Sequence, residues 1–420
     1  MASVSLINKD QKIREVGIMK NDILKKLIIT SFTVLFSGFL CAECFAQEEV
    51  ITLGHLNSFS GGTSLYGEDS KRGIELAIDE INASGGVEVK GKKYKVAVIH
   101  LDNKYQAAPG VASYRRLVDM HKVKFIHNMG TVPGRAIMQY NEKDGVLLDI
   151  ISPTETLNQL GNKLVLNQVV RPSGYDVPVV AEAWKRGCKN MCIIAEDSDF
   201  GREHTQIVKA SFEKLGGKVK GIEYVQANIG VDFMSILTKL KGYNPDSLYV
   251  ITVEEPGIRI AKQARELGYR GRMLFTEHFK QKSIDSIGLS KLEGTLFTGS
   301  VSTLSSVPVE GTPQGIMDYR ARYLAKYPGT YLSSTGCYGY NFVYYVTEAM
   351  KLAGTTTDAY KVRSMCDKSI KNLKMVKHGG FTKGGRAYGQ PVFVMAIDNG
   401  KPQIVGAASF PKSMAAQGEK

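Results

Sequence analysis

The sequence VKFIHNMGTVPGRAIMQYNEKDGVLLDIISPTET, residues 123–156, decides the fold of this chain. It holds two short apolar runs, Val123–Met129 and Gly145–Ile151, with a helical segment between them. Loops at the carboxyl ends of parallel strands line the binding crevice of such a sheet. We therefore expect the loops Gly130–Thr131 and Ser152–Thr156 to lie side by side there.

Both loops carry groups that bind, and neither carries a catalytic pair. They offer backbone N–H groups and hydroxyls, but no nucleophile beside a base. This combination favours holding a small anionic or polar group over transforming it.

The pattern around this stretch predicts two lobes of one class. Strands and helices alternate from 50 to 151 and again from 191 to 276, and only a few residues join them. Such βαβ units imply parallel sheets with helices on both faces. The sequence predicts an α/β fold of two doubly wound parallel-sheet lobes joined by a multi-segment hinge. The first lobe is expected to comprise 47–171 and 301–376, and the second 172–300 and 377–420.

Length and composition agree with this organisation. A chain of 420 residues is long enough for two domains, since a single core stops growing at about 250–300 residues. The contents of 43% apolar and 23% charged residues are those of a folded globular protein, which excludes disordered and low-complexity classes.

The first 46 residues have the layout of a secretory signal peptide. Three lysines between 20 and 26 precede an apolar run at 27–42, and Ala46 closes a small-x-small cleavage pattern. The run is shorter than the roughly 20 apolar residues of a spanning helix, which disfavours a membrane anchor. The residues before Cys41 and Cys44 also disfavour a lipoprotein. We predict a periplasmic protein cleaved near Ala46, with 1–18 as an upstream extension.

The net charge of +13 raises the alternative of a nucleic-acid or anionic-lipid partner. However, the lysines are scattered through turns such as 90–93 and 218–220, and they form no basic stripe with aromatic residues. The sequence favours a dispersed solubilising surface, no nucleic-acid partner, and a monomer.

Four cysteines remain after the predicted cleavage, and their spacing matches no zinc motif. An exported location permits disulfides, either Cys188 with Cys192 or Cys337 with Cys366. Buried thiols are the equal alternative for either pair.

Known catalytic and cofactor motifs are not found. The glycines at 61–62 and 130–134 match neither phosphate-loop pattern. The histidines lack metal-ligand spacing, and no serine has a nucleophile elbow. Ser198, between two aspartates, is most simply a helix cap. We therefore expect that the protein is not an enzyme and that it binds neither a metal ion nor a cofactor.

Three further residues are candidates for ligand contact. Glu277 follows a predicted strand at 272–276, where its carboxylate can pair with a ligand ammonium group. An exposed loop carboxylate is the equally open alternative. Tyr66 and Phe200 lie in predicted loops after strands, where aromatic rings commonly cover the apolar part of a ligand.

Motifs spread over the mature chain resemble, in the same order, the periplasmic binding proteins for leucine, isoleucine and valine. They are GHLNSFSG (54–61), YG (66–67), RGIELA (72–77), INASGG (81–86), ISPTET (151–156), DFG (199–201) and KQARELG (262–268). The resemblance implies the type 1 fold of the solute-binding proteins of ABC importers, with a membrane permease as partner.

The resemblance also implies roles for matching residues. Hydroxyl and backbone groups of the two loops hold the ligand α-carboxylate in that family, a glutamate takes the α-ammonium group, and an aromatic ring lies near the apolar side chain. The matching residues are Thr131, Thr154 and Thr156 in the loops, Glu277 for the ammonium group, and Tyr66 for the ring. Glu155, in the same loop, is a further candidate for ligand binding.

The chain departs from the family near the ammonium site. Phe200 stands at a position where the family often has tyrosine, and Val253 lies near the position of another tyrosine of the family. Ser173 stands at a position where the family has an acidic residue. Some relatives have a disulfide in the first lobe, and this chain has no cysteine at either of the two positions. These losses of polar groups leave room for an aromatic or aliphatic carboxylate, or an amide.

The sequence therefore predicts a solute-binding protein that closes its lobes, like a Venus flytrap, on a branched-chain or other neutral amino acid. Two alternatives stay open. The ligand is an aromatic or aliphatic carboxylate or an amide, or the protein is a ligand-sensing module for a receptor.

Overall fold

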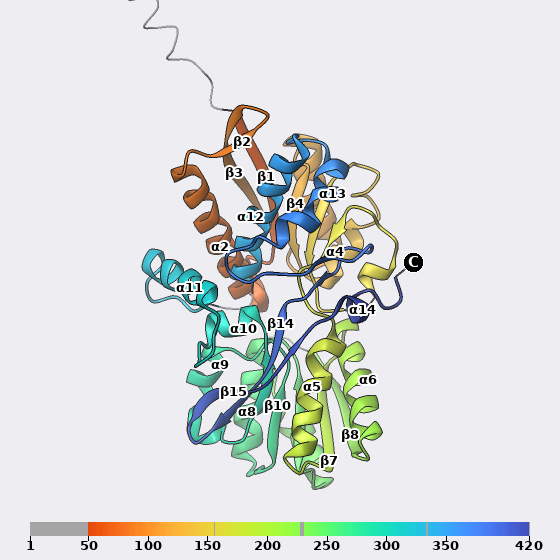
Figure 1. Ribbon diagram of the computed structural model, residues 1–420. Helices are drawn as coiled ribbons and strands as arrows, with labels where there is room; N and C mark the ends of the chain where they lie inside the picture. The colour runs from red at the N-terminus through yellow and green to blue at the C-terminus, as the bar shows by residue number, and fades with distance from the viewer. Residues whose placement is uncertain (1–48, 155, 227–230, 333–334, 420) are drawn as a thin grey trace, which may run out of the picture. The chain divides into compact units, whose positions relative to one another are not determined.

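The computed structural model describes residues 49–154, 156–226, 231–332 and 335–419. In this part of the chain the first sheet has the strand order β2-β3-β1-β4-β5-β6 (Figure 1). The strands are β1 (Glu49–Asn57), β2 (Val87–Val89), β3 (Lys92–Asp102), β4 (Phe125–Met129), β5 (Leu147–Ile151) and β6 (Val165–Leu166). Strand β1 pairs in parallel with β4, β4 with β5, and β5 with the edge strand β6.

The second sheet has the order β15-β14-β11-β10-β9-β7-β8. Its strands are β7 (Asn190–Glu196), β8 (Lys218–Val225), β9 (Ser247–Ile251), β10 (Arg272–Phe275), β11 (Leu296–Gly299), β14 (Pro391–Asp398) and β15 (Lys401–Ser409). Strands β7 to β11 pair in parallel, whereas β14 pairs antiparallel with both β11 and β15. Strands β14 and β15 form a hairpin with its turn at Asn399–Gly400.

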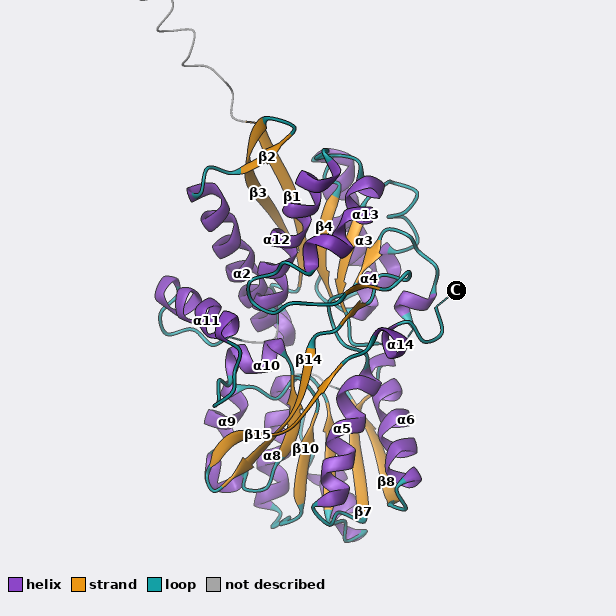
Figure 2. Cartoon of the chain, viewed as in Figure 1, coloured by secondary structure: helices purple, strands orange, loops and turns teal. Residues whose placement is uncertain are grey.

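Helices flank both sheets (Figure 2). Those packed with the first sheet are α2 (Ser64–Ala83), α3 (Ala107–Arg115), α4 (Thr131–Ile137), α12 (Gly336–Ala353) and α13 (Ala359–Ile370). Those of the second are α5 (Pro172–Lys185), α6 (Asp199–Lys214), α7 (Met234–Gly242), α8 (Glu254–Glu266) and α9 (Gln281–Ile287). The predicted α/β fold of two parallel-sheet lobes is confirmed, and we call them the first and second lobe by their sheets.

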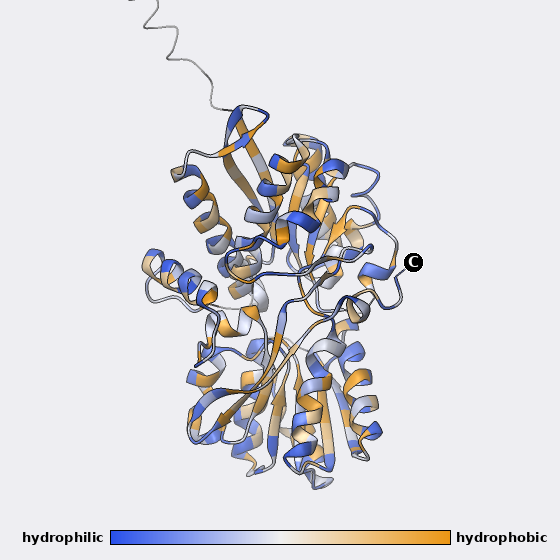
Figure 3. Ribbon diagram, in the orientation of Figure 1, coloured by the Kyte–Doolittle hydropathy of each residue, from blue (hydrophilic) through white to orange (hydrophobic). Residues whose placement is uncertain are grey.

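The stretch quoted at the outset forms the centre of the first sheet. All residues of β4 and β5 are buried, because helices cover both faces of a parallel sheet. Figure 3 shows the same apolar character in the strands of both sheets. The register pairs Met129 with Ile151, and the Gly130 N–H donates to the Ile151 carbonyl at 3.1 Å. The two loops that follow are therefore side by side, as predicted.

The chain crosses between the lobes several times, as expected of a multi-segment hinge. It crosses after β6 and again after β11, where α10 (Val301–Ser306) and α11 (Gln314–Lys326) lead to α12. The third crossing precedes β14. In Figure 1, β14 and β15 extend along the second lobe, and the C-terminus lies near α14 (Lys412–Ala415).

The segment before β14 differs from the sequence-based boundary that assigned 377–420 to the second lobe. Strands β12 (Gly380–Phe381) and β13 (Ala387–Tyr388) pair with each other, and Asn167 accepts and donates backbone hydrogen bonds with this segment at 2.8 Å. Asn167 directly follows β6 of the first sheet. The segment therefore packs on the first lobe, through contacts between residues more than 200 positions apart.

Two helices begin earlier than predicted. Helix α2 starts at Ser64, so Tyr66 lies in its first turn rather than in a loop. Helix α6 starts at Asp199, which places Phe200 in its first turn. Ser198 is the N-cap of α6, and its side chain accepts a hydrogen bond from the Gly201 N–H, which confirms the predicted cap.

The four cysteines of the described residues are buried free thiols, which decides between the two alternatives left by the sequence. None of the helices in the described ranges has the length and apolar character to cross a membrane. The predicted signal peptide lies outside the described residues.

Candidate ligand site between the lobes

A small cavity lies between the lobes. Its walls combine loops that follow the strands of both sheets with hinge segments. The first lobe contributes Tyr105, Met129, Gly130, Thr131, Ile151 and Pro153, the second contributes Phe200, Val253, Glu277 and His278, and the connecting segments contribute Val169, Ser302, Thr335 and Tyr338. This lining, mainly apolar and aromatic with a few polar groups, is that of a small-molecule site.

Gly130 and Thr131 form the wall of the first lobe, at the N-terminus of α4. Gly130 has φ of +108°, and a Cβ there would lie 2.9 Å from the Tyr105 ring. Glycine is therefore required on both conformational and steric grounds. It brings the start of α4 to the cavity with Thr131 as its first residue, where N–H groups favour an anionic group.

Thr131 belongs to a chain of buried hydroxyls. Its Oγ1 lies 2.7 Å from Ser152 Oγ, which lies 3.2 Å from Thr154 Oγ1. Thr154 is fully buried and is not among the cavity-lining residues. It is therefore placed to orient Ser152 and, through it, Thr131.

The loop that holds these hydroxyls is fastened by Arg386. Its guanidinium is fully buried and donates to the backbone carbonyls of Ser152, Thr154 and Val169, at 3.3 Å for Ser152 and 2.9 Å for Val169. One side chain thus ties the loop after β5 to the hinge segment after β6.

Thr156 lies away from the cavity, and Glu155 lies outside the described residues. Thr156 Oγ1 accepts a hydrogen bond from Arg135 at 3.1 Å and donates to Glu203 of the second lobe at 3.2 Å. Arg135 also lies 3.7 Å from Asp199. The structure therefore places Thr156 in a contact between the lobes.

Glu277 is the only acidic residue among the described residues that line the cavity. It follows β10, its side chain is 4% exposed, and neither carboxylate oxygen has a hydrogen-bond partner within the described ranges. A buried carboxylate without donors is costly. A cationic ligand group with N–H donors removes that cost.

The groups around Glu277 shift its pKa in opposite directions. Burial raises the pKa of Glu277 above its usual 4.5, and the Asp176 carboxylate adds to this, while His204 and Lys280 oppose it. His204 Nδ1 lies 2.6 Å from Asp176. Burial disfavours the charged imidazolium, but the charge of Asp176 outweighs it, so the pKa of His204 is raised to about 9.

Aromatic and apolar groups cover the rest of the second-lobe wall. Phe200 is 5% exposed and packs edge-on to His278, with ring centroids 5.4 Å apart. Burial lowers the pKa of His278 to about 3, so its ring is neutral and does not neutralise Glu277, although Nε2 is 3.6 Å from Oε1. The wall thus combines one carboxylate with a mainly apolar surface.

This arrangement can hold a small molecule and offers no acid-base pair aimed at one reacting atom. Hydroxyls and N–H groups lie on the first lobe, and a carboxylate with aromatic rings lies on the second. No group of three or more His, Cys, Asp or Glu residues in the described parts of the chain is arranged to hold a metal ion.

Comparison with known families identifies the protein class. The family model for periplasmic binding proteins matches residues 50–402, which is most of the chain. The chain belongs to the periplasmic binding protein family. The family resemblance in the sequence is confirmed.

Relatives of this periplasmic binding protein include homologues of Leu/Ile/Val-binding proteins. This chain is 27% identical over 356 residues to Leu/Ile/Val-binding protein homolog 7 of Brucella suis, and the match covers 80% of this chain and 85% of the relative. It is 26% identical over 260 residues to homolog 3 of Brucella melitensis, covering 60% and 67%.

Solved structures share the fold of this periplasmic binding protein. A branched-chain amino acid transporter substrate binding protein from Streptococcus pneumoniae, in complex with isoleucine, has a TM-score of 0.71 and 23% identity, covering 86% of this chain and all of that one. A solute binding protein from R. palustris, in complex with 4-hydroxybenzoate, has a TM-score of 0.72 and 18% identity, covering 87% and 98%.

In this periplasmic binding protein, Tyr66 joins the lobes and does not line the cavity. Its hydroxyl accepts a hydrogen bond from the Glu254 N–H at 3.1 Å and lies 3.4 Å from His278 Nδ1. Glu254 is the first residue of α8, so its N–H has no partner within that helix. Tyr66 of the first lobe therefore caps a helix of the second.

Replacing Tyr66 with phenylalanine should weaken ligand binding about three- to tenfold, because one interlobe hydrogen bond worth about 1 kcal/mol is lost only when the lobes meet. Isothermal titration with leucine, or with whichever amino acid binds most tightly, measures this. The free energy of unfolding of the ligand-free protein should change little. Unchanged affinity would contradict the role given to Tyr66.

Sequence reasoning missed several cavity residues of this periplasmic binding protein. Tyr105 follows β3, so the rule about carboxyl ends of strands could have found it. Ser302 and Tyr338 lie on the connecting helices α10 and α12, and no local pattern marks them. Ser302 accepts a hydrogen bond from the buried Lys280 at 3.1 Å, which places a second charge behind the cavity wall.

Proposed function

We propose that this protein captures a small neutral amino acid, such as a branched-chain one, outside the cytoplasm and delivers it to the permease of an ABC importer. The observation that carries the proposal is Glu277, a buried carboxylate without hydrogen-bond donors among the described residues, which faces the same cavity as Thr131. An amino-acid zwitterion complements both walls, since its ammonium group suits Glu277 and its carboxylate suits the start of α4.

The apolar part of the cavity supports a neutral side chain on the ligand. Phe200, Val253 and Met129 line the cavity together with Ile151. A charged ligand side chain would have to be desolvated against these groups without a partner. The names of the curated relatives, which refer to leucine, isoleucine and valine, agree with this ligand class.

The lobes are proposed to close on the ligand. A ligand that touches both walls binds the closed form better than the open form, and it shifts the population by that difference in affinity. Thr131 on one side, with Phe200 and Glu277 on the other, would make the bridging contacts. Thr154, Thr156 and Tyr66 would support closure from behind the walls.

An aromatic carboxylate is the second candidate, favoured by the ring of Phe200 and by a fold neighbour in complex with 4-hydroxybenzoate. Such a ligand brings no cation for Glu277. A carboxylate ligand would leave two like charges in one cavity unless Glu277 takes up a proton. We therefore rank it behind an amino acid.

Isothermal titration of the mature protein against the neutral amino acids, benzoate and 4-hydroxybenzoate tests the proposal. The expected result is heat with one or more aliphatic amino acids and none with the aromatic acids. Heat with none of the amino acids would overturn it. N-terminal sequencing of the exported protein tests the predicted cleavage near Ala46.

Binding should depend on pH in a direction that separates the candidates. The ionised form of Glu277 binds an ammonium group, and its pKa is raised above 4.5 by burial, with Asp176 adding to the effect. Amino-acid affinity should therefore fall as pH drops from 7 toward 5, before an ordinary glutamate titrates. His204, with a pKa of about 9, and Lys280, with a pKa of about 8, stay charged over this range.

Titration calorimetry at pH 5, 6 and 7 measures the pH dependence. An aromatic carboxylate should show the opposite trend, since protonation of Glu277 removes the repulsion. Affinity for an amino acid that does not change with pH would contradict a role for Glu277 in binding the ammonium group.

A further inference from the structure

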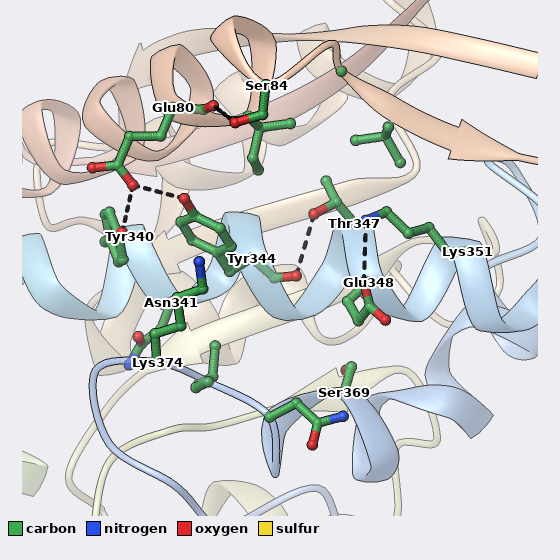
Figure 4. Close-up of a pocket in the computed structure, with 15 residues that line it drawn as sticks. Glu80, Ser84, Tyr340, Asn341, Tyr344, Thr347, Glu348, Lys351, Ser369 and Lys374 are labelled. Atoms are coloured by element: carbon green, nitrogen blue, oxygen red, sulfur yellow. Dashed lines mark hydrogen bonds and ion pairs between the residues drawn. The ribbon is translucent and has the colours of Figure 1, made fainter. Parts of the chain in front are cut away.

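A second cavity lies within the first lobe, apart from the site between the lobes. It has a volume of about 310 Å³ and lies between α2, α12 and the segment after α13 (Figure 4). Its lining includes Glu80 from α2 and Tyr340, Asn341, Tyr344, Glu348 and Lys351 from α12. It shares no lining residue with the cavity between the lobes.

The charges at this cavity are mostly paired. Glu80 accepts hydrogen bonds from the hydroxyls of Tyr340 at 2.6 Å and Tyr344 at 2.7 Å, and from Arg322 Nε at 2.8 Å. Figure 4 shows the Glu80 carboxylate facing the two tyrosines across the gap between α2 and α12. Glu348 pairs with Lys351 at 3.2 Å. An ionic ligand would have to compete with these contacts.

Asn341 is the exception to this pairing. It is 1% exposed and lines the cavity, yet its Oδ1 has no hydrogen-bond partner within the described residues. Leaving such a group unpaired costs about 1–3 kcal/mol, and buried amides nearly always have a partner. An apolar side chain at position 341 would avoid this cost. The unpaired amide oxygen is explained by a hydrogen-bond partner that enters from the cavity.

Tyr340, Asn341 and Tyr344 occupy neighbouring positions on one side of α12. The two tyrosine rings have centroids 4.9 Å apart, and their hydroxyls are engaged by Glu80. Tyr340 is 3% exposed and its ring packs against Tyr319 and Tyr344, so the half-buried ring of Tyr344 offers the apolar surface. Asn341 carries a planar donor and acceptor beside it.

We propose that this cavity is a second ligand site, which binds a small neutral molecule carrying a carboxamide group. A carboxamide can form two hydrogen bonds with the Asn341 amide at once, donating one and accepting the other. A hydroxyl has a single O–H group, so it cannot pair with the amide donor and acceptor in this planar arrangement. The apolar remainder of the ligand packs on Tyr344. The site lies on one lobe, so it does not require closure.

Benzamide and acetophenone are matched probes for this site, because they have the same shape but acetophenone has a methyl group in place of the amide nitrogen. The experiment uses the mature ¹⁵N-labelled protein, and it follows the side-chain amide signal of Asn341, which is assigned by its loss in Asn341→Leu. We expect benzamide to shift this signal, and acetophenone to bind about tenfold more weakly or worse, since a donor to Oδ1 is missing.

Asn341→Leu should weaken benzamide binding about tenfold or more and should raise the unfolding temperature of the protein without probe. Asn372→Ala is the matched control, because Asn372 lines the same cavity but is exposed. Its affinity for benzamide should stay within about twofold of the original.

Three results would overturn the proposal. They are equal binding of the two probes, no shift of the Asn341 signal at about 20 mM benzamide, well above a millimolar Kd, and a crystal structure grown with benzamide that holds only water beside Asn341. If Asn341→Leu fails to fold, the affinities of the two probes for the unaltered protein still decide the matter, because they do not need the assigned Asn341 signal. None of these results bears on amino-acid binding between the lobes.

Discussion

Replacing Glu277 with glutamine should weaken binding of a neutral amino acid by about 2–5 kcal/mol, which is roughly 30-fold or more. Glutamine keeps the size of the side chain but removes its charge. The ligand ammonium group then enters a buried cavity without a counter-charge, and the amide nitrogen of the introduced glutamine adds a donor where an acceptor is needed. Isothermal titration measures the loss.

The same substitution should not raise the free energy of unfolding without ligand, because it takes from the buried Lys280 its largest neighbouring negative charge. The loss of amino-acid binding is therefore the readout that tests the role of Glu277. Glu266→Gln is the control, since Glu266 is an exposed carboxylate on α8 of the same lobe. Retained amino-acid binding in Glu277→Gln would refute the assigned role.

Replacing Arg386 with methionine should lower the free energy of unfolding by about 3–5 kcal/mol. The guanidinium is fully buried, and its loss leaves the carbonyls of Ser152, Thr154 and Val169 without this donor. Each such buried group costs about 1–3 kcal/mol. Denaturation in urea, with the slope compared between variants, measures the change.

Ligand binding should fall as well, because Arg386 holds the loop that carries Ser152 and orients Thr131. Arg202→Met is the matched control, since the Arg202 side chain is 53% exposed and pairs with Asp197 at the surface. It should cost less than about 1 kcal/mol. If the two variants lose equal stability, Arg386 does not fasten the loop as described.

The sequence by itself determined the class of the fold and the edge of the sheet where the site lies. The apolar runs at 125–129 and 147–151 are short and continuous. A run of this kind between helical segments indicates a buried strand of a parallel sheet. Once the strands are placed, their register brings Gly130 and Ser152 together. Glu277 was found in the same way, because it follows the last residues of a strand.

The tertiary structure alone decided which side chains face the cavity. Thr154 and Thr156 lie in the predicted loop, but the hydroxyl of Thr154 is directed to Ser152, and Thr156 contacts Glu203 of the other lobe. Tyr66 was predicted to cover a ligand, yet it caps α8 from across the lobes. A side chain's direction depends on partners that are distant in sequence, so local periodicity cannot supply it.

The same reason explains the placement of the C-terminal segment, of Arg386 and of Asn341. The 380–388 segment packs on the first lobe because its backbone meets Asn167, and Arg386 is buried because three carbonyls from other segments surround it. Patterns along the chain report periodicity, caps and turns, which act over a few residues. Burial of a single polar group depends on long-range packing, and only the folded chain brings those neighbours together.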